Sequence, residues 1–266
     1  IYPRLVAAEY KKSEKTTVVK SGVIELDTIL GGGLDSGTST LFSGVSGTGK
    51  SAMVTRFVVE AAKRGEKSAM YIFDERVQTL YQRSMGLGMD LERYVDEGKI
   101  IMRQIDPAEL SPGEFSDMVV TMVEDMGVKL VVIDSLNGYS YALPEERFLS
   151  IYLHELSSYL NQKAVAALFV LTQTGKRNMD MLGSFDVSYI SDTIITFRHL
   201  EYGSRYYKSL SIHKKRGGSH ETGTRIILMG PDGIDVRKPE DLFGKSNKDS
   251  PAKEPEGYKS LEEPDF

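Results

Sequence analysis

A phosphate-binding loop is the clearest chemical motif in this chain of 266 residues. Residues 44–51 read Gly-Val-Ser-Gly-Thr-Gly-Lys-Ser and match the pattern G-x-x-x-x-G-K-S/T between a predicted strand and a predicted helix. Its glycines let backbone N–H groups turn toward phosphates, Lys50 can reach the β and γ phosphates, and Ser51 can bind Mg²⁺. The motif predicts an ATP site formed by Ser46, Gly47, Thr48, Gly49, Lys50, Ser51 and Ala52.

A second magnesium ligand is expected at the end of an apolar strand. Asp134 follows the run Leu-Val-Val-Ile at 130–133, and carboxylate oxygens are preferred Mg²⁺ ligands. An aspartate there could also cap a helix or begin a turn, but the P-loop favours the metal role. We therefore predict that Mg²⁺ is held by Ser51 and Asp134.

Hydrolysis also needs a group that orients water or accepts its proton. Asp74 and Glu75 follow an apolar strand and, with Lys50, are the catalytic candidates. Adjacent strand residues point in opposite directions, so one carboxylate would face the γ-phosphate. Alternatively, both begin the next helix, where negative charge is favourable. Gln173 ends another apolar strand and could sense the γ-phosphate or cap a helix.

The elements that position these residues form an α/β pattern. Apolar, β-branched runs at 38–45, 68–74, 100–105, 129–135 and 166–173 alternate with helical periodicity at 51–64, 114–126 and 145–161. Such continuous apolar runs are typical of parallel strands covered by helices on both faces. After residue 192 the pattern changes to strands at 193–200, 205–215 and 224–230, separated by turn residues. We predict a mostly parallel central sheet flanked by helices, with C-terminal antiparallel strands at one edge.

Two further segments resemble a known superfamily. Residues 21–34 resemble the segment that precedes the P-loop in RecA, RadA and KaiC proteins, and residues 214–220 resemble the K-x-R-G-x-x-H segment of KaiC-type domains. With Asp74-Glu75 and Asp134-Ser135-Leu136, the resemblance covers roughly residues 16–240. It implies a RecA-like fold and a homo-oligomer, a hexameric ring with ATP between subunits.

The resemblance also implies that each subunit completes its neighbour's site with residues from 214–220. These are Lys214, Lys215, Arg216, Gly217 and His220. The spacing of Lys214 and Arg216 would place both on one face of a strand, where they could contact phosphates as an arginine finger does. The alternative for this basic pair is a solvated strand end.

KaiC-type second domains phosphorylate themselves on neighbouring hydroxyl residues, and residues 188–192 resemble that segment. Ser188 falls on the family's serine, whereas Tyr189 replaces its threonine and would place the acceptor oxygen farther from the backbone. Asp74 likewise replaces the first of two family glutamates. These departures bear on autophosphorylation, for which Ser188 and Tyr189 are the candidates, and leave ATP binding untouched.

Composition limits the other possibilities. With 40% hydrophobic and 27% charged residues and no apolar run of about 20 residues, the chain predicts a globular domain without a membrane span. It has no cysteine, which fits the cytoplasm, and its net charge of -5 does not favour nucleic acid as a partner. We expect a linker at 1–15, like the one leading into the second of two tandem ATPase domains, an ATPase domain at 16–244 and a flexible tail at 245–266.

Three functions fit these observations. The first is an ATPase, with serine, threonine or tyrosine autokinase activity as an extension, that signals to protein partners in KaiC-like or circadian-type regulation. The second is a DNA-acting recombination or repair ATPase of the RecA or RadA type, against which the acidic balance weighs. The third is a nucleotide-dependent assembly module, which would not need the carboxylates Asp74 and Glu75 near the γ-phosphate.

Overall fold

The computed structural model describes residues 17–244, apart from positions 110, 142, 144–146 and 174–188. Its centre is a nine-stranded sheet in the order β11-β10-β9-β8-β3-β7-β6-β4-β5, and β1 and β2 form a separate small sheet. The strands are β1 Val18–Val19, β2 Leu34–Asp35, β3 Ser39–Gly44, β4 Ser68–Ile72, β5 Ile100–Gln104, β6 Leu130–Asp134, β7 Ala166–Thr172, β8 Thr193–Tyr202, β9 Arg205–Lys215, β10 Arg225–Gly230 and β11 Gly233–Arg237. The helices are α1 Ile24–Ile29, α2 Lys50–Lys63, α3 Val77–Gly86, α4 Leu91–Asp96, α5 Pro112–Glu124, α6 Leu136–Ser140, α7 Arg147–Gln162 and α8 Pro239–Phe243.

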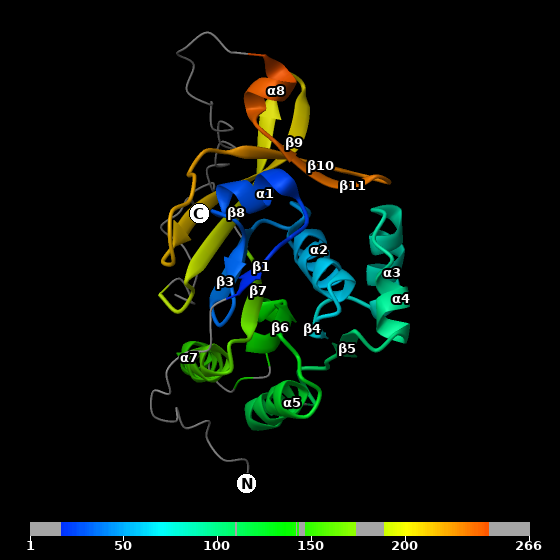
Figure 1. The fold of residues 1–266 in the computed structure, drawn as a ribbon, viewed down its shortest axis with the longest axis vertical. Helices are drawn as coiled ribbons and strands as arrows, with labels where there is room; N and C mark the ends of the chain where they lie inside the picture. The colour runs from blue at the N-terminus through cyan, green and yellow to red at the C-terminus, as the bar shows by residue number, and fades with distance from the viewer. Residues whose placement is uncertain (1–16, 110, 142, 144–146, 174–188, 245–266) are drawn as a thin grey trace, which may run out of the picture.

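The central parallel strands β3, β4, β6 and β7 are buried on both faces. Strands β5, β4, β6, β7, β3 and β8 run parallel to one another. Along β6, Val131 and Ile133 join a core that includes α5 and α7, whereas Leu130 and Val132 join a core that includes α2. Figure 1 shows α5 and α7 lying apart from α2, α3 and α4. Two apolar layers explain why these strands read as continuous hydrophobic runs.

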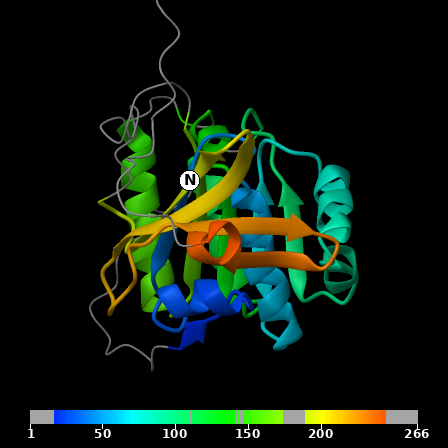
Figure 2. The same cartoon turned by 90° about the horizontal axis from the view of Figure 1, so that it is seen from above.

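The C-terminal strands extend the sheet in antiparallel fashion. β8 pairs with β9, β9 with β10, and β10 with β11, so the order at this edge follows the chain. Gly203 and Gly233 have positive φ values of 61° and 115° at or beside the tight turns of two of these hairpins. Figures 1 and 2 show the β10–β11 hairpin lying over α2, whose first residue belongs to the P-loop.

The observed fold confirms the predicted α/β class with its mixed sheet. Several details differ from the expected elements, among them the short elements α1, α6, α8, β1 and β2, which were not assigned. The strand expected at 68–74 ends at Ile72, residues 77–96 form α3 and α4, which were not assigned, and β11 adds a final strand. Within the part of the chain that the structure describes, no helix is long and apolar enough to cross a bilayer.

Candidate functional site

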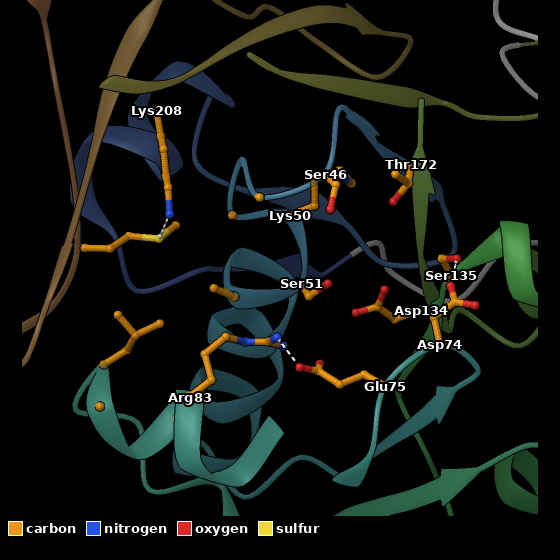
Figure 3. Close-up of a pocket in the computed structure, with 16 residues that line it drawn as sticks. Ser46, Lys50, Ser51, Asp74, Glu75, Arg83, Asp134, Ser135, Thr172 and Lys208 are labelled. Atoms are coloured by element: carbon orange, nitrogen blue, oxygen red, sulfur yellow. Dashed lines mark hydrogen bonds and ion pairs between the residues drawn. The ribbon is translucent and has the colours of Figure 1, made fainter. Parts of the chain in front are cut away.

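A cavity of about 750 Å³ lies where the P-loop meets the ends of strands β4, β6 and β7. The antiparallel strands β9 and β10 line its other side. Figure 3 shows the side chains that converge on it from these segments. The lining residues are Ser46, Gly47, Gly49, Lys50, Ser51, Ala52, Asp74, Glu75, Arg83, Gly86, Leu87, Asp134, Ser135, Thr172, Lys208 and Met229.

The P-loop has the backbone geometry that its glycines permit. Gly47 and Gly49 have φ values of 79° and 99°, in the left-handed region that favours glycine, and Gly49 is the N-cap of α2. The Thr48 hydroxyl donates a hydrogen bond of 2.8 Å to the Val45 carbonyl, which closes the loop on itself. The start of a fourteen-residue helix therefore faces the cavity, a favourable position for phosphate groups.

Lys50 is a buried cation within the P-loop. Lys50 is only 5% exposed, and its ammonium donates a hydrogen bond of 2.8 Å to the Val45 carbonyl. Burial lowers the pKa of Lys50 to about 8, while the carboxylate of Asp134 acts in the opposite direction. A phosphate group entering the cavity would offer this ammonium stronger hydrogen-bond acceptors than one backbone carbonyl.

Ser51 and Asp134, the two predicted magnesium ligands, lie together. The Ser51 side chain is hydrogen-bonded to Asp134, and Figure 3 shows the two residues facing each other. Burial raises the pKa of Asp134 to about 6, although the Ser51 hydrogen bond and the charge of Arg83 act against this rise. One hydroxyl and one carboxylate, with room for phosphate oxygens and water, suit the octahedral coordination of Mg²⁺.

Asp74 is held close to the end of β6. It accepts a hydrogen bond from the Ser135 hydroxyl, which also accepts one from the backbone N–H of Gly138. A Cβ on Gly138 would lie 2.3 Å from the Phe73 Cβ and 2.7 Å from Asp74 Oδ1. The close approach of α6 to this carboxylate therefore depends on a glycine.

Glu75 has a different partner. Its carboxylate forms an ion pair of 2.5 Å with Arg83 of α3. Which of the two would face the γ-phosphate stays a prediction, and Asp74 and Glu75 both line the cavity. The physical reason is that β4 ends at Ile72, and strand alternation no longer applies to residues 74 and 75. Neither residue belongs to a helix, because α3 begins at Val77.

At the end of β7, the cavity is lined by Thr172 rather than Gln173. The Gln173 backbone N–H donates a hydrogen bond of 3.0 Å to the carbonyl of Gly44, the first P-loop residue. Asn137 of α6 fixes Thr172 through two hydrogen bonds, one to each of its backbone polar groups, at 2.8 and 3.0 Å. Gln173 therefore joins β7 to the P-loop through its backbone.

Six cavity residues were not singled out from the sequence: Arg83, Gly86, Leu87, Thr172, Lys208 and Met229. Lys208 of β9 and Met229 of β10 lie beside the P-loop, and a Cβ on Gly49 would lie only 2.3 Å from the Met229 Cε. Ser135 was noted within the resemblance but given no role. Lys208 and Met229 come from antiparallel strands whose pairing brings them to the cavity, and no local motif marks them.

Comparison with known proteins identifies the family of this domain. A family model described as the KaiC ATPase matches residues 19–241. The chain belongs to the KaiC ATPase family. It is 26% identical over 235 residues to the circadian clock protein KaiC3 of Synechocystis sp., covering 88% of this chain and 46% of that protein. It is 24% identical over 237 residues to the circadian clock oscillator protein KaiC of Synechococcus elongatus, covering 89% of this chain and 45% of that protein. The chain thus spans about half the length of the curated relatives it matches.

The KaiC-like segment 214–220 lies outside the cavity of its own chain, because none of its residues is among those that line it. β9 ends at Lys215, so Arg216 lies one residue beyond the strand on which it was expected. Arg216 is exposed, and its guanidinium donates a hydrogen bond of 2.7 Å to the Tyr189 carbonyl and lies 3.5 Å from Asp192. His220 is half-buried in the loop between β9 and β10, to which the exposed Gly217 also belongs.

Lys215 is placed differently from its neighbours. Its ammonium donates hydrogen bonds of 2.5 and 3.1 Å to the carbonyls of Leu30 and Gly33, and its side chain is only 5% exposed. Lys215 therefore contacts its own subunit, which does not suit the expected contact with a neighbour's nucleotide.

The candidate phosphorylation sites of the KaiC resemblance are only partly described. Ser188 lies outside the described residues. Tyr189 is 51% exposed and is not among the residues that line the cavity. Tyr189 is therefore not placed in the nucleotide cavity of its own chain.

Proposed function

We propose that this domain binds ATP with Mg²⁺ in the cavity beside the P-loop and hydrolyses it. The observation that carries the proposal is the convergence of Lys50, the Ser51–Asp134 pair and two further carboxylates on one cavity. Membership of the KaiC ATPase family supports ATP binding and ATPase activity as its general function.

Each group then has a definite role. The backbone N–H groups at the start of α2 and the Lys50 ammonium bind the β and γ phosphates. Ser51 and Asp134 would hold Mg²⁺, which neutralises charge on the phosphate oxygens when it is bound. Asp74 and Glu75 orient the attacking water and accept its proton as its oxygen bonds to the γ-phosphorus and ADP leaves.

A binding experiment tests the nucleotide site. Lys50→Ala removes the P-loop's own side-chain cation, so we expect Mg-ATP binding measured by calorimetry to be abolished. Asp134→Asn should instead retain ATP binding and weaken its dependence on Mg²⁺. Wild-type affinity in the Lys50→Ala protein would contradict the proposed site.

The proposal extends to a hexameric ring in which Lys214, Arg216 and His220 act on ATP held by the neighbouring subunit. Their position outside the cavity of their own chain supports this arrangement. Subunits carrying Lys50→Ala could still donate these residues, and subunits carrying Lys214→Ala with Arg216→Ala could still bind ATP. Mixed rings of the two inactive variants should therefore recover ATPase activity, provided that native mass spectrometry shows that mixed rings form. Activity no higher than that of the separate variants would refute the shared site.

A KaiC-like regulatory role through protein partners is the broader part of the proposal. The matched relatives are named circadian clock proteins, and this chain covers under half of each of the two compared above. Autophosphorylation at Ser188 or Tyr189 belongs to the same proposal. Mass spectrometry after incubation with Mg-ATP would report phosphorylated residues, ADP production and oligomer mass together.

A further inference from the structure

The loop between β9 and β10, residues 216–224, has no regular secondary structure and is largely exposed. It carries Arg216 and His220, two of the residues proposed to act on a neighbour's ATP. A basic group aids phosphoryl transfer only when it is held close to its productive position. The contacts that fix this loop therefore matter for phosphoryl transfer as well as for the fold.

The first attachment is Lys215, at the end of β9. Its ammonium binds two carbonyls of the turn between α1 and β2, those of Leu30 and Gly33, and lies 3.9 Å from Asp35. The three consecutive glycines at 31–33 have φ values of 70°, 116° and 138°, which let this turn follow a path closed to other residues. Two backbone carbonyl oxygens of the turn thus bind the buried ammonium of Lys215.

The second attachment is Arg225, at the start of β10. Its guanidinium forms hydrogen-bonded ion pairs of 2.6 Å with Glu25 of α1 and 2.5 Å with Glu221 of the loop. The Arg225 side chain is only 6% exposed. The Glu25 side chain is 27% exposed, so its pair with Arg225 is partly shielded from water and stabilises one geometry more strongly than the pair with Glu221, whose side chain is 56% exposed.

The middle of the loop contacts the end of α1, the same turn and β2. The Glu221 N–H donates a hydrogen bond of 3.0 Å to the Ile29 carbonyl. A Cβ on Gly31 would lie 2.6 Å from the Ser219 carbonyl oxygen, and one on Gly217 would lie 2.7 Å from Asp35 Oδ2. Both ends and the middle of the loop are therefore attached to residues 25–35 of the same subunit.

We infer that Lys215 and Arg225 are positioning residues that fasten the loop 216–224 to α1 and the glycine turn, so that its basic groups are presented to the next subunit. Lys215 then acts on the neighbour's ATP only through the loop. This inference rests on the proposed sharing of sites between subunits.

Hydrogen exchange of the nucleotide-free protein tests the fastening itself. Lys215→Met removes the ammonium and keeps much of the side-chain volume. Glu25→Gln weakens the hold on Arg225 without changing any basic residue. Both variants should raise amide exchange in residues 217–224 by about tenfold, including the Glu221 N–H, and leave the P-loop peptide 44–52 unchanged.

Two ion pairs on the surface supply control variants. Lys63→Met removes a lysine of α2 whose side chain is 44% exposed. Glu97→Gln removes a carboxylate that is paired with Arg93, and the Glu97 side chain is 32% exposed, close to the 27% of Glu25. Neither control should change exchange in the loop. Unchanged loop exchange in both test variants would overturn the inference, as would a rise matched by the controls.

Mixed rings then show which subunit's site depends on Lys215. Lys215→Met is added either to the donor subunits that carry Lys50→Ala or to the acceptor subunits that carry Lys214→Ala and Arg216→Ala. We expect recovered ATPase activity to fall at least about tenfold when the change is in the donor and to persist when it is in the acceptor. Equal loss in both placements would mean a general stability effect and would overturn the inference.

The two proposals fail in different ways. If the parent mixture of variants recovers no activity, the shared site is wrong, and hydrogen exchange alone decides whether Lys215 and Arg225 fasten the loop. A Lys215 that touched the neighbour's phosphates directly would affect the donor but leave loop exchange in the nucleotide-free protein unchanged. If the Lys215→Met protein does not fold, Glu25→Gln provides both measurements.

Discussion

We expect the charge of Lys50 to lower the free energy of unfolding of the nucleotide-free domain. The substitution Lys50→Met should measure the size of this effect. Its ammonium is buried beside the P-loop and donates a hydrogen bond to the backbone carbonyl of Val45. Burial lowers the pKa of the group from 10.5 to about 8, even though Asp134 lies near enough to raise it. Lys50→Met keeps the length of the apolar side chain and removes the charge.

The lowered pKa gives the magnitude and its pH dependence. A difference of roughly 2.5 pKa units corresponds to about 3 kcal/mol of unfolding free energy at pH 7, and loss of the hydrogen bond to Val45 offsets about 1 kcal/mol. We therefore expect Lys50→Met to raise the unfolding free energy by about 2 kcal/mol at pH 7. Below pH 8 the native lysine is charged, and the cost is complete. Between pH 8 and 10.5 the native state loses the proton while the unfolded chain keeps it, so the stability of the wild type rises and the difference shrinks.

Urea unfolding of the nucleotide-free, metal-free proteins at pH 7 and pH 9.5 would measure this difference. Lys63→Met, on the exposed side of α2, is the control and should leave stability unchanged within about 0.5 kcal/mol. Added Mg-ATP should stabilise the wild type and not Lys50→Met, because only the wild type binds it. Equal or lower stability of Lys50→Met at pH 7, or a difference that does not decrease at pH 9.5, would refute the reasoning.

Two further predictions concern the carboxylates and one concerns Tyr189. Asp74→Asn with Glu75→Gln should leave ATP binding intact and lower turnover by roughly 10² to 10⁴, and unchanged turnover would place the base elsewhere. Gly138→Ala should displace Asp74, lowering turnover and reducing the unfolding free energy by about 1–3 kcal/mol in urea titrations, since its Cβ would lie 2.3 Å from the Phe73 Cβ. Tyr189→Phe should leave ATPase turnover unchanged in steady-state assays, because the ring is exposed outside the cavity of its own chain; a clear loss would tie it to the reaction.

The fold could be predicted because its strongest signals are local. Parallel strands buried on both faces read as continuous apolar runs, and the P-loop supplies its own turn and helix start. α3 was missed for a physical reason as well. Among its ten residues only Leu80 and Ser84 are buried, so its sequence has a narrow apolar stripe. That helix nevertheless supplies Arg83, which pairs with Glu75.

Only those parts of the candidate site that lie within one sequence segment could be predicted. Residues of the P-loop and the carboxylates at strand ends were found, since each follows an apolar run. Lys208 and Met229 could not be found, because they reach the cavity through strand pairing between β8, β9 and β10. Pairing of this kind is a long-range property that no spacing in the sequence reports.

The polar contacts of Asp74 and Glu75 show that a sequence motif locates a candidate residue but does not reveal the contacts on which its chemistry depends. Asp74 is bonded to Ser135, 61 positions later, and Glu75 is bonded to Arg83 of a helix that the sequence pattern did not indicate. Both acids are thus engaged by partners from different elements, and their reactivity depends on those partners as much as on their position after β4. The same holds for Lys215, whose residue type suggests a phosphate ligand and whose contacts bind it to Leu30 and Gly33. A basic residue in a family motif therefore indicates which segment acts on the nucleotide. Its contacts decide whether that residue binds the phosphate itself or positions another residue that binds it.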